Sequence, residues 1–135
     1  MMSRFTRFAL IAALLLGVTA CTSKPLQNVE NRTPAAAVSK TEDDMRRAIL
    51  TALQQRRWTV ERADRGQILA RLSVRKHEAE ISIPYSATSY SILYRDSQNL
   101  GYKNGKIHRN YNKWIHNLDL SIQQALNSPA PYVYQ

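Results

Sequence analysis

Apolar side chains recur every three or four residues in two stretches of the chain, 41–57 and 109–127. In the first stretch Thr41 stands before three carboxylates, as an N-cap residue stands before an acidic first turn. The second stretch carries the stronger pattern, in Ile107 or Tyr111, Trp114, Ile115, Leu118, Ile122, Ala125 and Leu126. This spacing predicts an amphipathic helix in each stretch, with one buried face.

Between the two predicted helices, apolar and polar residues alternate with a period of two. The alternation covers four short runs, 58–63, 68–75, 79–85 and 89–95. Short connections predict an antiparallel meander, and Pro84, which has no amide proton to donate, marks a strand end or an edge. The expected fold class is α+β, in the order α-β-β-β-β-α, with two helices packed on one face of a four-stranded antiparallel sheet.

The first residues have a different pattern. Arg4 and Arg7 precede the apolar run 9–16, and small residues follow up to Cys21. A basic start, a short apolar run and small residues before a cleavage point form a secretory signal. Eight to ten apolar residues make roughly 12–15 Å of helix, too short for a hydrocarbon core of about 30 Å.

The tetrapeptide Val18-Thr19-Ala20-Cys21 resembles the lipobox of bacterial lipoproteins. This resemblance implies that residues 1–20 are removed and that Cys21 becomes the lipidated first residue, which anchors the chain to a membrane. In such families an aspartate after the cysteine is linked with inner-membrane retention. The residue here is Thr22, so the expected location is the outer membrane, facing the periplasm.

Composition limits the part that follows the signal. Residues 21–135 number 115, enough for one domain. We expect a lipidated cysteine with a flexible tether over 21–40, because prolines and polar residues show no period there, an α+β domain over 41–128, and a tail over 129–135. Cys21 is the only cysteine of the chain, which excludes an intrachain disulfide, a cysteine-based metal cluster and a cysteine nucleophile.

The mature part is basic, since 17 basic against 10 acidic residues leave a formal charge of +7. A basic excess favours anionic neighbours such as phospholipid head groups, phosphorylated glycolipid or an acidic protein surface, although solubility alone explains it equally well. Nucleic acid is not expected as a partner of an exported protein.

The sequence offers little for catalysis or metal binding. His108 and His116 share a helix face but lie about 12 Å apart along the axis, too far for one metal ion. Asp96, Ser97 and His108 are the types of a hydrolytic set, but no nucleophile-elbow motif surrounds Ser97. We therefore expect a protein that is not an enzyme and that has neither metal nor other cofactor.

Tyrosines and basic residues gather where the third and fourth predicted strands, the loop 96–106 and the last helix meet. The aromatic members are Tyr85, Tyr90, Tyr94, Tyr102, Tyr111 and Trp114, and half of them are expected in the core. A groove with tyrosine walls and basic rims would suit an anionic lipid, glycan or peptide. The candidate ligand-binding residues are Arg95, Tyr102, Lys106, His108, Arg109, Tyr111 and Lys113.

A second basic patch is predicted on the outer face of the strand 68–75, where Arg71 and Arg75 flank Ser73. The alternative is an ordinary solvated sheet face.

The stretch from Ile83-Pro84-Tyr85 to His108-Arg109-Asn110-Tyr111-Asn112-Lys113-Trp114-Ile115 resembles a family of small proteobacterial lipoproteins. The resemblance implies an α+β domain behind a lipobox and carries no known activity. The function expected from the whole sequence is a non-catalytic binding module anchored in the cell envelope. The alternative is a structural or assembly accessory that binds another envelope protein.

Overall fold

The computed structural model describes residues 22–128. The predicted signal, Cys21 and the predicted tail 129–135 lie outside these residues. The elements, in chain order, are β1 (Ser23–Pro25), β2 (Val29–Arg32), the 3-10 helix η1 (Ala35–Ser39), α2 (Glu42–Gln55), β3 (Thr59–Asp64), β4 (Gln67–Val74), β5 (His77–Pro84), β6 (Tyr90–Gln98), β7 (Lys106–His108) and α3 (Arg109–Asn127).

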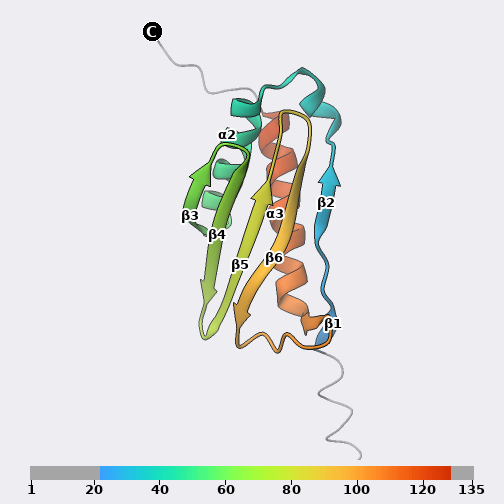
Figure 1. Ribbon diagram of the computed structural model, residues 1–135, viewed down its shortest axis with the longest axis vertical. Coiled ribbons are helices and arrows are strands. Elements are labelled where there is room, and N and C mark those ends of the chain that lie inside the picture. Colours follow the sequence, from blue (N-terminus) through green and yellow to red (C-terminus); the bar gives the residue numbers. More distant parts are fainter. Residues whose placement is uncertain (1–21, 129–135) are drawn as a thin grey trace, which may run out of the picture.

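Two layers make up the domain, a twisted antiparallel sheet and a pair of helices that covers one face of it (Figure 1). The sheet order is β2-β6-β5-β4-β3, and β1 pairs with β7 in a separate two-stranded sheet. The α+β class and the four-strand meander are therefore confirmed. The predicted four-stranded sheet was one strand short, because β2 adds to the free edge of β6.

The core lies between the layers and follows the predicted periodicity. Alternate residues of β4 and β5, such as Ile68, Ile81 and Ile83, are fully buried against Leu53 of α2 and Leu118 of α3. Thr41 caps α2 as predicted, with its backbone N–H donating to the Asp44 carboxylate at 2.9 Å and its hydroxyl accepting from the Asp44 N–H at 3.1 Å. The bond from the Thr41 backbone also lowers the pKa of Asp44.

Residues 22–40 do not form the flexible tether that their composition predicted. Lys24 of β1 lies across from Ile107, Val29 of β2 lies across from Ile92, and Ala37 of η1 is 1% exposed. Backbone hydrogen bonds hold the segment to elements far along the chain, for example from Leu26 N–H to the carbonyl oxygen of Gly105 at 2.8 Å. Such bonds need no hydrophobic period, which is why the pattern of side chains did not reveal these strands.

Asn112 fixes the same segment from the side of α3. Its Oδ1 accepts a hydrogen bond from the Gln27 N–H at 3.0 Å, and its Nδ2 donates to the carbonyl oxygen of Pro25 at 2.9 Å. One side chain therefore satisfies a backbone donor and a backbone acceptor in the link between β1 and β2.

We expect Asn112→Ala to lower the free energy of unfolding by about 1–2 kcal/mol, because two hydrogen bonds to backbone groups are lost. Thermal unfolding followed by circular dichroism should show a midpoint lower by roughly 5–15 °C. His116→Ala is the matched control, since His116 lies one helical turn further along and is exposed. Equal midpoints for the two variants would contradict the role given to Asn112.

A buried polar cluster joins β2, β6 and α3. The Asp119 carboxylate, 3% exposed as a residue, accepts from Arg32 Nη2 at 2.7 Å and from the Tyr90 hydroxyl at 2.5 Å. The hydrogen bond that Arg32 donates to Asp119, and the negative charge of Asp119, raise the pKa of Arg32. Burial, followed by the same carboxylate, raises the pKa of Tyr90. The cluster fixes β2, the edge strand of the sheet, to the helix layer.

Candidate functional site

One end of the elongated domain is assembled from segments that are distant in the sequence: β1, the β4–β5 turn, the loop 99–105, β7 and the start of α3 (Figure 1). Asn99 holds the β4–β5 turn in place. Its Nδ2 donates to the carbonyl oxygen of Lys76 at 2.7 Å, and its own carbonyl oxygen lies 2.6 Å from His77 Nδ1. The rings of His77 and His108 then lie with their centroids 5.8 Å apart. These contacts fix the β4–β5 turn, the loop 99–105 and β7 relative to one another.

The loop between β6 and β7 is shaped by residues that tolerate a left-handed backbone. Asn104 and Gly105 have φ values of 52° and 72°, which suits a tight two-residue turn. The backbones of Lys103 and Lys106 exchange hydrogen bonds of 2.9 and 3.0 Å across this turn. This turn places two lysines side by side.

The start of α3 connects this loop to the first described residue. His108 is the N-cap, and its Nδ1 accepts from the Asn110 N–H at 3.1 Å. The next backbone N–H, that of Arg109, donates to the carbonyl oxygen of Thr22 at 2.7 Å. Thr22 and Arg109 are therefore fixed beside one another.

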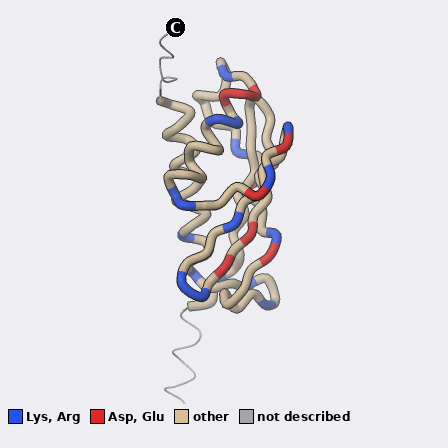
Figure 2. Tube along the Cα trace, turned by 90° about the vertical axis from the view of Figure 1, so that its left-hand side faces the viewer, with Lys and Arg blue, Asp and Glu red and all other residues tan. Residues whose placement is uncertain are grey.

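We define the basic end as the six basic residues that these segments bring together: Lys24, Arg75, Lys76, Lys103, Lys106 and Arg109. All six are exposed, and within residues 22–128 none of them forms an ion pair. Blue segments gather at the lower end of the tube in Figure 2, where these residues lie. Lys113 follows Arg109 by one helical turn and is also exposed.

The structure brings together part of the predicted binding set. Lys106, His108 and Arg109 lie at the basic end, with Tyr102 in the loop that precedes β7. Sequence reasoning missed Lys24 and Lys76, which belong to the same end through β-pairing and a loop contact. A signal for this end was present, because the chain has no acidic residue from position 97 to position 118.

The tyrosines form a stack rather than the walls of a groove. Tyr102, 49% exposed, stacks on Tyr94 with a centroid distance of 4.5 Å, and Tyr94 meets the edge of Tyr111 at 5.6 Å. Tyr111 is fully buried and its hydroxyl has no hydrogen-bond partner among the described residues. Burial raises the pKa of Tyr111. The prediction that Tyr111 contacts a ligand was wrong, because the period that marked it also placed it in the core.

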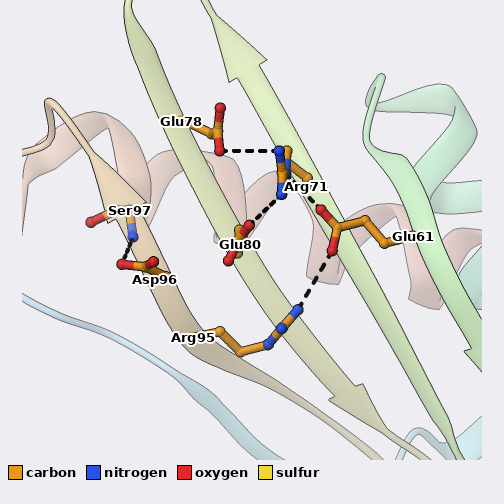
Figure 3. Close-up of polar contacts among 7 residues, drawn as sticks. All are labelled: Glu61, Arg71, Glu78, Glu80, Arg95, Asp96 and Ser97. Carbon is orange, nitrogen blue, oxygen red and sulfur yellow. Dashed lines mark hydrogen bonds and ion pairs between the residues drawn. The ribbon is translucent and has the colours of Figure 1, made fainter.

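Arg95 lies away from the basic end, on the outer face of the sheet (Figure 3). Its guanidinium is 3.8 Å from the Glu61 carboxylate. The predicted grouping of Arg95 with Lys106 and Arg109 was therefore wrong, because β6 turns it toward the opposite side of the sheet from the helices.

The predicted basic patch around Arg71 was also wrong. Three glutamates surround Arg71, with the nearest atoms at 2.6 Å from Glu61, 3.4 Å from Glu78 and 2.6 Å from Glu80 (Figure 3). Burial disfavours the charged form of Arg71, but these carboxylates outweigh it and raise its pKa. The other member of the patch, Arg75, lies in the β4–β5 turn and belongs to the basic end.

The residue types of a hydrolytic set are engaged elsewhere. The Asp96 carboxylate accepts from the Ser97 N–H at 2.8 Å, and the Ser97 hydroxyl lies 2.8 Å from the Tyr94 hydroxyl. His108 Nδ1 accepts from the backbone of α3. Among residues 22–128, no group of three or more histidine, cysteine, aspartate or glutamate side chains is placed to hold a metal ion.

Three surface cavities, of about 360, 370 and 520 Å³, lie away from the predicted binding residues. The first lies between α2 and the end of α3, the second between Trp58 and Trp114, and the third beside Tyr85. None of the three is lined by Tyr102, Lys106 or Arg109. The six residues of the basic end are exposed, and none of them lines these three cavities.

An exposed cluster of basic side chains attracts anionic surfaces through long-range electrostatics, without a pocket to select one small molecule. No helix in the described part of the chain is long and apolar enough to cross a membrane. Comparisons of the chain with protein-family models, with curated proteins and with solved structures found no match.

Proposed function

We propose that this protein is a lipoprotein of the bacterial cell envelope, anchored through lipid on Cys21 in the outer membrane and facing the periplasm. Its single α+β domain acts as a non-catalytic binding module for an anionic envelope ligand. The observation that carries the proposal is the position of Cys21. It ends the lipobox-like tetrapeptide and directly precedes Thr22, where the described domain begins.

The basic end supports the binding part of the proposal. Lys106 and Arg109 are exposed there and form no ion pair within residues 22–128. By contrast, ion-paired arginines lie on the sheet or near the start of α2, where acidic residues accompany them. These arginines are Arg47, Arg62, Arg71 and Arg95. An uncompensated cluster of one sign favours a ligand of the opposite sign.

The anchor is tested by growing bacteria that express the full chain with a clickable palmitate analogue. We expect the parent chain to be labelled and Cys21→Ala to be unlabelled, because a thiol is needed to accept the lipid. Ser23→Ala, two residues further along, is the matched control and should be labelled like the parent. Undiminished labelling of Cys21→Ala would refute the proposed anchor.

A further inference from the structure

We infer that the basic end rests directly on the anionic phospholipid surface that carries the anchor, so that the headgroup layer itself is the ligand of the domain. The long axis of the domain then stands away from the membrane. This inference rests on the proposed function and identifies the ligand that the function left open.

The first step is that the folded domain begins at Thr22, the residue after the proposed lipid attachment site. Thr22 is fixed by its hydrogen bond from Arg109, and Ser23 already pairs across from His108. Consecutive Cα atoms lie about 3.8 Å apart, so Cys21 lies within roughly 4 Å of Thr22. A flexible segment of residues 22–40 would instead reach roughly 65 Å when extended. A lipid on Cys21 therefore holds this end of the domain at the bilayer surface.

The second step is the distribution of charge along the long axis. Lys24, Arg75, Lys76, Lys103, Lys106 and Arg109 all lie at the end from which the described chain begins. The opposite end carries both signs of charge. The acidic first turn of α2 lies there (Figure 1), with Arg47 3.6 Å from Asp44 and Arg65 3.6 Å from Glu42. The domain is thus polarised, with its positive end next to the anchor.

The third step concerns the partner. The surface next to the anchor faces the bilayer, which leaves lipid rather than a second protein as its neighbour. A cluster of basic residues is a common attachment to anionic membranes beside covalent lipid. Each basic residue near an anionic surface strengthens binding roughly fivefold. Tyr102, half exposed at the same end, fits the interfacial layer, where tyrosine rings are enriched.

The test removes the lipid and keeps the surface. All core residues that the structure describes lie between Ala37 and Leu126, so the chain from residue 21 with Cys21→Ser retains the folded domain. Its binding is measured by co-sedimentation with vesicles of equal parts phosphatidylglycerol and phosphatidylcholine. Vesicles of phosphatidylcholine alone are the comparison. At about 0.1 M salt, where the Debye length is about 10 Å, we expect binding to the anionic vesicles only.

Two variants with the same loss of charge locate the surface. The end variant carries Lys24→Gln, Lys76→Gln, Lys103→Gln and Lys106→Gln, and should bind roughly 600-fold more weakly, at about fivefold for each lysine. The matched control carries Lys40→Gln, Arg47→Gln, Arg62→Gln and Arg65→Gln, away from the basic end, and should stay within about threefold of the parent. Circular dichroism should show that both variants are folded.

Three results would overturn the inference: no binding of the parent to anionic vesicles, equal binding to neutral vesicles, or an equal loss in the two variants. Because the vesicle experiment uses a chain without lipid, its failure leaves the lipid-labelling result standing. An unlabelled parent chain in cells would refute the proposed anchor whatever the vesicles show.

Discussion

A chain that lacks residues 22–33 is expected to be unfolded or nearly so at 25 °C. The deletion removes β1 and β2, and with them the only basic partner that the structure shows for Asp119. It also removes backbone hydrogen bonds to Gly105 and Arg109, and the bonds of Ser91 and Tyr94 to Asn31 and Asn28. Hydrogen bonds contribute about 1 kcal/mol each, and the ion pair adds to them, so the loss is at least about 5 kcal/mol. Small domains have only about 5–15 kcal/mol of stability in total.

The measurement is urea denaturation of the chain from residue 21 with Cys21→Ser, compared with the same chain after the deletion. A length-matched variant in which glycine and serine replace residues 22–33 separates chain length from the specific contacts. We expect this variant to be nearly as unstable as the deletion. A glycine-serine segment lacks the side-chain contacts of Asn28 and Arg32, and ordering its flexible backbone costs more conformational entropy. A deletion variant as stable as the parent would show that the segment is a tether after all.

The helices and the meander could be predicted because hydrophobic periodicity determines them. Thr41 and the acidic turn behind it marked the start of α2, and the bounds of α3 agree with the predicted stretch 109–127. In β4 and β5 the alternation of apolar residues matched the face that the helices cover. Elements whose stability comes from a buried face leave that face visible in the sequence.

The N-terminal strands could not be predicted, because their stability comes from single polar contacts. Asn112 and Asn28 bond to backbone atoms 87 and 66 residues away, and no local pattern marks such partners. The same limit applies to charge. Arg71 and Arg95 are basic in the sequence, but the sheet register places glutamates beside them. Candidate binding residues could be named by type, but their free charges became visible only in three dimensions.

Replacing Arg32 by methionine should lower the free energy of unfolding by about 2–3 kcal/mol at pH 7. Methionine keeps the apolar stem, but the Asp119 side chain, 5% exposed, then holds its charge with the Tyr90 hydroxyl as its remaining donor. Breaking a fully buried ion pair typically costs about 3–5 kcal/mol. The value here is smaller because the Arg32 side chain is 47% exposed, so that water already screens the pair.

Urea denaturation of the parent and of Arg32→Met at pH 7 measures this difference in the free energy of unfolding. A variant as stable as the parent would contradict the role given to the ion pair between Arg32 and Asp119.

The double variant Arg32→Met with Asp119→Leu provides the control. It removes both charges and fills the site with apolar groups, an exchange that is often neutral or stabilising for buried pairs. The Tyr90 hydroxyl then loses its carboxylate partner but keeps the longer contact, 3.4 Å, with the Asp119 backbone carbonyl position. We expect the double variant to recover most of the stability lost by Arg32→Met. If it is as unstable as the single variant, the loss of stability does not come from the unpaired charge of Asp119.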